Sequence, residues 1–237
     1  MIRRLLAAVL LLLAAAPVAV AEGCILDNCV DRQPVNQSAT RPQTRRGGPS
    51  GDFDFYVLAL SWSPSFCAVN GDRAPAQCAT GANPGFVVHG LWPQYDNGFP
   101  SRCPGNPFLP FSVLSSLGDL YPDQGLARHE WRQHGLCSGK SPTGYFADVR
   151  AARAVVAIPA AFKAPGAERS LSPLDIQRAF FEANPRLRPG MMALTCRRGM
   201  FQEARFCLSK DLRDFVACPQ VARQSCRGQN VTMPVAQ

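Results

Sequence analysis

Residues 53–62 are FDFYVLALSW, a run of aromatic and aliphatic side chains that ends at Ser63 and Pro64. A second apolar run, GFVVHGLW, occupies residues 85–92 and ends at Pro93. Short apolar runs that are bounded by turn-forming residues are typical of buried strands. We therefore expect both runs to form central strands.

The rest of the chain has three segments with helical patterns and two strand-like segments that flank a short turn. The expected helices cover residues 125–137, where Gly135 can end the helix, residues 143–156, and a segment from the capping signature Ser172-Pro173-Leu174-Asp175 to Pro185; the expected hairpin strands cover residues 191–196 and 200–208. Because helices and hairpin strands are segregated along the chain, we expect an α+β fold.

The length and composition are those of one folded domain. The chain has 237 residues, of which 46% are hydrophobic and 18% charged, so it can bury a sizeable core. The sequence contains no internal repeat, which argues against solenoid and propeller folds. We expect a single domain over residues 51–237.

Residues 1–21 have the features of a secretory signal peptide. Arg3 and Arg4 precede an unbroken apolar stretch at residues 5–16, and Ala19-Val20-Ala21 is an A-x-A cleavage site. The apolar stretch is shorter than the roughly 20 residues that a membrane span needs. We expect export to the periplasm or the cell exterior, with no membrane partner and a mature protein that begins near Glu22.

Residues 22–50 are expected to form a tail ahead of the domain. Cys24 and Cys29 can close a small loop, and residues 30–50 are rich in Pro, Gly, Gln and Arg without apolar periodicity. Such a composition is typical of a flexible linker.

The excess of basic residues belongs to the folded protein. The whole chain has a formal net charge of +8, and removal of Arg3 and Arg4 leaves 23 basic against 17 acidic residues, a net charge of +6. Nearly all of the basic residues are arginines, whose planar guanidinium suits bidentate phosphate contacts. An anionic partner fits this charge, although a solvated arginine-rich surface would give the same composition.

Ten cysteines in an exported chain predict a disulfide framework. They are Cys24, Cys29, Cys67, Cys78, Cys103, Cys137, Cys196, Cys207, Cys218 and Cys226. No two of them have the C-x-x-C spacing of a zinc knuckle or a thioredoxin-like site, so we expect neither a metal nor a redox role.

The chain has only three histidines, and they are close to two tryptophans in the sequence. His89 lies in an expected strand, whereas His129 and His134 lie in an expected helix. Histidine donates and accepts protons near neutral pH, so this clustering predicts a site of acid–base catalysis. The alternative is that all three are hydrogen-bonded structural residues.

Helical geometry brings four polar side chains to one face of the expected helix. At about 100° per residue, Glu130, Gln133 and His134 lie within about 140° of His129. Such a face can move protons and bind a charged group. The H-E-x-x-x-H spacing differs from the zinc-binding H-E-x-x-H, in which the histidines are four residues apart, so we expect no metal and regard a metal-dependent hydrolase as a remote alternative.

Two segments resemble the signatures of a known family. His89-Gly90-Leu91-Trp92-Pro93 and residues 129–137, HEWRQHGLC, are similar to the two signature segments of the ribonuclease T2 family of secreted endoribonucleases. The likeness extends to residues 53–62 and to the cysteine pattern, and so covers about residues 51–226. It implies an α+β fold with a central antiparallel sheet flanked by helices, and metal-independent cleavage of single-stranded RNA. We also expect a monomer without a cofactor.

The resemblance also implies a role for each catalytic residue. The ribose 2′-hydroxyl would attack the adjacent phosphorus to give a 2′,3′-cyclic phosphate, which is then hydrolysed to a 3′-phosphate. His134 would be the general base and His89 the general acid. Glu130 and a protonated His129 would contact the phosphate.

An aromatic face for the RNA base is expected at Trp92, which could equally be a core side chain. We expect base preference to depend on the pocket around Trp92, Gln94, Tyr95 and Leu126. The tryptophan of the second signature, Trp131, is expected in the core.

The chain departs from the family pattern at Gln133, where the family usually has lysine. The fixed positive charge on the phosphate is therefore missing, and the adjacent Arg132 would point about 100° away from Gln133 on a helix. The amide can still donate a hydrogen bond, so we expect weaker activity rather than none. The main alternative is an inactive RNA-binding or toxic protein on the same fold.

The resemblance implies a pairing for the cysteines. The expected bridges are Cys67–Cys78, Cys103–Cys137, Cys196–Cys226 and Cys207–Cys218, which leaves Cys24 and Cys29 to pair with each other. The second bridge would tie the catalytic helix to the loop after the first signature.

Overall fold

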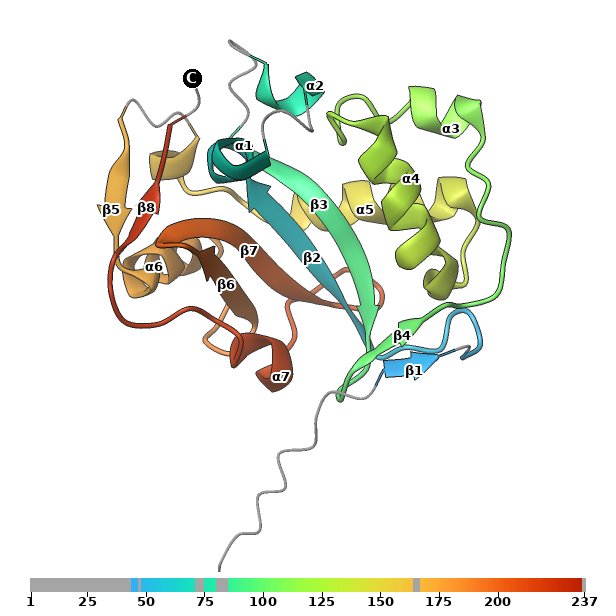
Figure 1. The fold of residues 1–237 in the computed structure, drawn as a ribbon. Helices are drawn as coiled ribbons and strands as arrows, with labels where there is room; N and C mark the ends of the chain where they lie inside the picture. Colours follow the sequence, from blue (N-terminus) through green and yellow to red (C-terminus); the bar gives the residue numbers. More distant parts are fainter. Residues whose placement is uncertain (1–43, 47, 71–74, 80–84, 164–166, 236–237) are drawn as a thin grey trace, which may run out of the picture. The chain divides into compact units, whose positions relative to one another are not determined.

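A computed structural model describes residues 44–46, 48–70, 75–79, 85–163 and 167–235 of the chain. The expected signal peptide, most of the expected tail and the Cys24–Cys29 pair lie outside these residues. The described part is an α+β structure in which helices pack around a six-stranded sheet (Figure 1).

The sheet has the strand order β3-β2-β7-β8-β5, and β6 pairs with β7 beside this path. The strands are β2 (Phe55–Trp62), β3 (Phe86–Gln94), β5 (Arg169–Leu171), β6 (Met192–Arg197), β7 (Met200–Ser209) and β8 (Val231–Met233). All pairings are antiparallel except the single contact between Met200 of β7 and Thr232 of β8. The expected central antiparallel sheet is therefore confirmed.

A separate two-stranded sheet includes part of the segment that we expected to be a linker. Strand β1 (Thr44–Arg46) pairs in parallel with β4 (Phe99–Ser101). The backbone of these three residues is thus hydrogen-bonded to the domain, which the lack of apolar periodicity did not indicate.

Only one of the two expected central strands is central. β2 lies between β3 and β7, whereas β3 ends the strand path and so has an edge position among the described residues. β3 also continues through Pro93, which pairs with Tyr56, to Gln94. A proline has no N–H to donate, and an edge strand tolerates it because one side of the strand needs no partner.

Successive side chains of β2 point to opposite faces of the sheet, and both faces are covered. Tyr56, Leu58 and Leu60 belong to the main hydrophobic core. Phe55 and Val57 belong to a smaller cluster on the other face. This second face carries the polar site described below.

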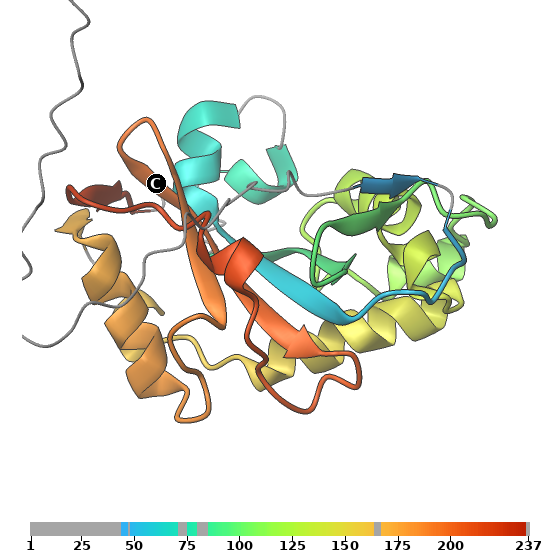
Figure 2. The same ribbon diagram turned by 90° about the horizontal axis from the view of Figure 1, so that it is seen from below.

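Seven α-helices and two 3-10 helices connect the strands in the described part of the chain. They are α1 (Ser63–Asn70), α2 (Pro75–Cys78), α3 (Phe111–Ser115), α4 (Gln124–Gln133), η2 (Gly135–Ser138), α5 (Pro142–Val155), η3 (Ala160–Phe162), α6 (Pro173–Ala183) and α7 (Pro219–Ala222). α5 packs against β2 and β3 (Figure 2). The capping signature is confirmed, because the Ser172 hydroxyl accepts from the Asp175 N–H at 3.1 Å. In the described ranges no helix combines the length and the hydropathy that a membrane span requires.

The helix that carries His129 and Glu130 ends earlier than the sequence predicted. α4 stops at Gln133, and His134 leaves the helical conformation with φ −127° and ψ −44°. Its N–H still bonds to the carbonyl of Glu130 at 2.9 Å, and η2 continues the chain to Gly139, whose φ is +74°. The direction of the His134 side chain therefore cannot be taken from helical periodicity.

The expected hairpin and four of the expected bridges are confirmed. β6 and β7 are joined at Arg198 and Gly199, which both have positive φ, as a tight two-residue hairpin turn requires. The bridges are Cys67–Cys78, Cys103–Cys137, Cys196–Cys226 and Cys207–Cys218. Every cysteine of the described residues is in one of them.

Candidate active site

His89 reaches the polar face of the sheet through a β-bulge. Ala59 of β2 pairs with Gly90, and the next residue of β2, Leu60, pairs with Val88, so His89 is the extra residue between them. With a regular register His89 would stand opposite Leu60, whose side chain lies in the main core. The bulge instead turns the imidazole toward the opposite face, as bulges near functional sites commonly do.

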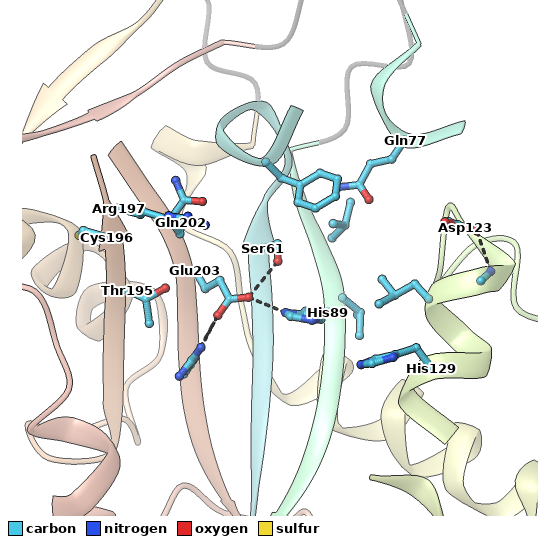
Figure 3. Close-up of a pocket in the computed structure, with 16 residues that line it drawn as sticks. Ser61, Gln77, His89, Asp123, His129, Thr195, Cys196, Arg197, Gln202 and Glu203 are labelled. Atoms are coloured by element: carbon cyan, nitrogen blue, oxygen red, sulfur yellow. Dashed lines mark hydrogen bonds and ion pairs between the residues drawn. The ribbon is translucent and has the colours of Figure 1, made fainter. Parts of the chain in front are cut away.

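A carboxylate from β7 holds the His89 ring. Glu203 Oε1 lies 2.5 Å from His89 Nδ1 and also accepts a hydrogen bond from the Ser61 hydroxyl at 3.2 Å. The other oxygen, Oε2, accepts from Arg205 Nε at 3.0 Å and from a terminal nitrogen of Arg205 at 2.8 Å. Figure 3 shows the Glu203 carboxylate reaching from β7 toward both Ser61 of β2 and His89 of β3.

A second carboxylate, that of Glu130, approaches His89 from α4. Glu130 is buried, and its Oε2 accepts a hydrogen bond from Trp92 Nε1 at 2.9 Å. Its Oε1 lies 3.7 Å from His89 Nε2. This approach depends on Gly90, because a β-carbon at residue 90 would overlap the Glu130 carboxylate.

Trp92 lies between the two expected catalytic histidines. Its ring centroid is 5.2 Å from that of His89 and 5.4 Å from that of His134. The guanidinium carbon of Arg205 lies over the same indole at 5.0 Å. Trp92 therefore contacts both histidines, and Trp131 is buried in the core, as expected.

Two cavities open beside these residues. The larger, of about 650 Å³, is lined by His89, His129 and Glu203, with His129 pointing toward the strand that carries His89 (Figure 3). The smaller, of about 250 Å³, is lined by His134 and Trp92. Arg205 lines both.

The two histidines have opposite electrostatic environments. Burial lowers the pKa of His89, but the hydrogen bond to Glu203 and the charges of Glu203 and Glu130 outweigh burial, so that its pKa is raised. Burial, together with the charges of His89 and His129, lowers the pKa of His134 to about 3. The pKa of His129 is also lowered, by burial and by nearby cationic groups.

The pKa values of the two carboxylates, Glu130 and Glu203, are also shifted in opposite directions. Burial raises the pKa of Glu130 to about 7, against the opposing effects of His89 and of the Trp92 hydrogen bond. For Glu203, burial is outweighed by the hydrogen bond and charge of His89 and by Arg205, which lower its pKa to about 2. The lowered pKa keeps Glu203 ionised near neutral pH, whereas the raised pKa of Glu130 lets that carboxyl change protonation there.

Several expected site residues lie elsewhere. Gln133 and Arg132 are exposed, and neither lines the two cavities. The expected base pocket is divided: Gln94 lines the smaller cavity with Trp92, whereas Leu126 lines the larger one. Tyr95 is buried, with its hydroxyl 3.4 Å from an Asp52 carboxylate oxygen.

Sequence reasoning missed Ser61, Glu203 and Arg205. Glu203 and Arg205 are two residues apart on a strand, so they share one face of β7. Two charged residues with this spacing in an otherwise apolar strand, MFQEARFCLS, were the available signal. Their partner His89 is 114 positions away from Glu203, and only the sheet register shows that they meet.

Within the described ranges no group of three or more His, Cys, Asp or Glu side chains is arranged to hold a metal ion. Instead, His89 contacts the carboxylates of Glu130 and Glu203. Glu130 and His134 contact the Trp92 indole. Their geometry suits proton transfer and the binding of a charged group.

Comparisons with known proteins identify the family of the chain. A model of the ribonuclease T2 family matches residues 53–218. The chain is 36% identical over 174 residues to a ribonuclease of Aeromonas hydrophila, which covers 72% of this chain and 79% of that protein. It is 27% identical over 199 residues to ribonuclease DdI of Dictyostelium discoideum, covering 75% and 83% of the two chains. An RNase-related protein from Calystegia sepium has a similar fold, with a TM-score of 0.59 at 22% identity over 78% of this chain and 98% of that one.

Proposed function

Because the chain belongs to the ribonuclease T2 family and is an endoribonuclease, we propose that it cleaves single-stranded RNA by transphosphorylation. The ribose 2′-hydroxyl attacks the adjacent phosphorus, the bond to the 5′-oxygen breaks, and a 2′,3′-cyclic phosphate forms. Water then opens this ring to a 3′-phosphate. DNA lacks the 2′-hydroxyl and is therefore not a substrate.

Two histidines carry the protons in this reaction. Neutral His134 accepts the proton of the 2′-hydroxyl, and protonated His89 donates a proton to the leaving 5′-oxygen. In the hydrolysis step the roles reverse, because His89 is then neutral and can accept a proton from water, and His134 can return its proton to the 2′-oxygen.

The observation that carries this proposal is the placement of His89 and His134 on Trp92, in environments that shift their pKa values in opposite directions. A raised pKa keeps His89 protonated, and a lowered pKa keeps His134 neutral. Such a separation of two titratable groups is how active sites assign an acid and a base.

The neighbouring side chains bind the substrate. Glu130 and His129 contact the phosphate, and Glu130 in its acid form can donate a hydrogen bond to a phosphate oxygen. The pKa of His129 is lowered in the free protein, and the negative charge of the bound phosphate favours its protonated form. A base stacks on Trp92 in the smaller cavity, where the Gln94 amide offers hydrogen bonds. Side chains supply every proton transfer and phosphate contact in this scheme, so the proposed reaction needs no metal or cofactor.

We further propose that the protein acts outside the cytoplasm as a monomer. The leader-like residues 1–21 support export. The four disulfides of the domain also support it, because such bridges persist in oxidising compartments.

The test is degradation of polyribonucleotide and polydeoxyribonucleotide with and without EDTA. We expect RNA to be cut in EDTA, DNA to remain intact, and mass spectrometry of early products to find 2′,3′-cyclic phosphates. Cutting that EDTA abolishes would refute metal independence. RNA that is bound but not cut would identify the alternative, an inactive binding protein, which the exposed Gln133 in place of lysine motivates.

A further inference from the structure

The carboxylate of Glu203 is held in one position by three strands. Its two oxygens are bound by His89 from β3, Ser61 from β2 and Arg205 from β7. Ser61 and Glu203 are direct partners in the β2–β7 register. The Glu203 side chain is only 11% exposed, so it has little freedom to turn away from the His89 ring.

A carboxylate in this position determines which nitrogen of His89 carries a proton. An ionised carboxylate only accepts hydrogen bonds, so the nitrogen that faces it at 2.5 Å, Nδ1, must be the donor. The other nitrogen, Nε2, then faces Glu130 and is the one that can exchange a proton with a substrate. We propose that Glu203 is a positioning residue for His89, which holds the imidazole in this orientation and stabilises its protonated form.

Several charged groups face His89, and they do not act in the same direction. Glu203 and Glu130 favour the imidazolium, whereas Arg205 opposes it. His129 and His134 also interact with His89 as like charges. Burial opposes the imidazolium as well, yet the net pKa of His89 is raised.

The two carboxylates beside His89 differ in how constant their charge is. Glu130 has a pKa of about 7 because it is buried, so it is partly protonated at the near-neutral pH at which His89 must act as an acid. Glu203 has a pKa of about 2 because His89 and Arg205 overcome its burial, so it is ionised throughout that range. Glu203 is therefore the carboxylate that can hold His89 protonated.

The competing explanation is that Glu203 and Arg205 form only a structural ion pair between neighbouring positions of β7. That pair would contribute to stability without any effect on the titration of His89. The two explanations differ in measurable quantities, namely the pKa of His89 and the pH at which activity is lost.

The experiment compares the wild-type chain with Glu203→Gln. The Gln side chain has nearly the same shape and can still accept from Nδ1, but it has no charge. The pKa of His89 is measured by NMR titration of the imidazole C2–H signals, which the presence of only three histidines makes assignable. The alkaline limb of kcat/KM on a dinucleoside monophosphate is measured in parallel. Glu182→Gln on α6, an exposed carboxylate outside the site, controls for the loss of one negative charge.

We expect Glu203→Gln to lower the pKa of His89 by at least about one unit and to move the alkaline limb by the same amount. We also expect the rate to fall about 10–100-fold, as is typical when a partner of an active-site histidine is changed. Glu182→Gln should leave both pKa and rate unchanged. If Glu203→Gln leaves the pKa of His89 and the alkaline limb in place, Glu203 is structural and the inference is wrong.

Two further variants keep the test decisive. Should Glu203→Gln fail to fold because Arg205 is left unpaired, the double variant Glu203→Gln/Arg205→Gln removes both charges. A fall in the pKa of His89 is still expected, but a smaller one, because Arg205 opposes the imidazolium and is removed as well. The inference also rests on the proposed function, in which His89 is the acid. If His89→Ala leaves the wild-type rate unchanged, that function fails, whereas the NMR titration still decides whether Glu203 controls the charge of His89.

Discussion

Gly90→Ala adds one methyl group, and this group should displace the carboxylate of Glu130. An added β-carbon would overlap Glu130 Oε2 and Trp92 Nε1 and would lie only 2.6 Å from Glu130 Cδ. The backbone of Gly90 cannot retreat freely, since it is paired with Ala59 beside the bulge. The Glu130 side chain must therefore move away from His89.

The substitution should lower both the free energy of unfolding and kcat, each for a different structural reason. Movement of Glu130 breaks its 2.9 Å hydrogen bond with Trp92, and a hydrogen bond to a charged group is worth about 1.5–3 kcal/mol. The free energy of unfolding should fall by about that amount. A displacement of about 1 Å in a catalytic group can lower the rate about 10²-fold, so we expect the loss in kcat to be of that size.

The assay combines steady-state kinetics on a dinucleoside monophosphate with urea unfolding of the same preparations. Gly118→Ala is the matched control, because a β-carbon there would meet nothing within 4 Å. It should leave kcat unchanged. The kinetics are measured at a temperature where each variant is fully folded, so that the loss in kcat is independent of the loss in stability.

A double-mutant cycle with Glu130→Gln tests whether Gly90→Ala lowers kcat through the Glu130 carboxylate. If Gly90→Ala acts through the Glu130 carboxylate, adding it to Glu130→Gln should lower kcat much less than it does in the wild type. Full activity in Gly90→Ala, or losses that multiply in the double variant, would refute the reasoning from this contact.

The remaining predictions concern the acid and base, the departure from the family pattern, and one bridge. His89→Ala and His134→Ala should each lower kcat about 10²–10⁴-fold with little change in Tm; equal losses of activity and stability would mark them as structural. The kcat/KM profile should be a bell: activity is lost at low pH as His134, with its pKa of about 3, becomes protonated, and at high pH as His89, with its raised pKa, loses its proton. A rate that shows no alkaline fall at any pH where the protein remains folded would contradict this assignment. Gln133→Lys should leave kcat nearly unchanged, because residue 133 is exposed and lines neither cavity; a gain of about tenfold, the size expected for one added charge-assisted hydrogen bond, would show that this side chain does reach the phosphate. Replacing Cys103 and Cys137 by serine should lower the free energy of unfolding by about 2–4 kcal/mol in urea titrations, and unchanged stability would contradict a structural role for that bridge.

Local patterns in the sequence predicted much of the fold. The apolar run at residues 53–62, the capping signature at Ser172 and the turn at Arg198-Gly199 correspond to β2, α6 and the β6–β7 hairpin. Each is determined by neighbouring residues, through side-chain alternation, a capping hydrogen bond or positive φ angles. The pairing of the four described bridges and the fold family were predicted from the family resemblance. That resemblance also depends on short segments, residues 89–93 and 129–137.

The end of α4 shows where such reasoning stops. Helical periodicity placed His134 on the face of His129 and Glu130, whereas the backbone leaves the helix at His134. The side chain there lies against Trp92, a contact with another element of the fold. A helical wheel describes residues only while they remain helical, so it could not give the contact between His134 and Trp92 of β3.

The sequence by itself determined which residue types are available for acid–base chemistry: three histidines, two of them beside Glu130 in a signature segment. Only the tertiary structure decided that a bulge in β3 turns His89 away from the core, and that Glu203 and Arg205 meet it there. The physical reason is that strand register joins residues more than 100 positions apart. A shift of one residue exchanges the two faces of a strand, so the whole sheet must form before His89 has its partner.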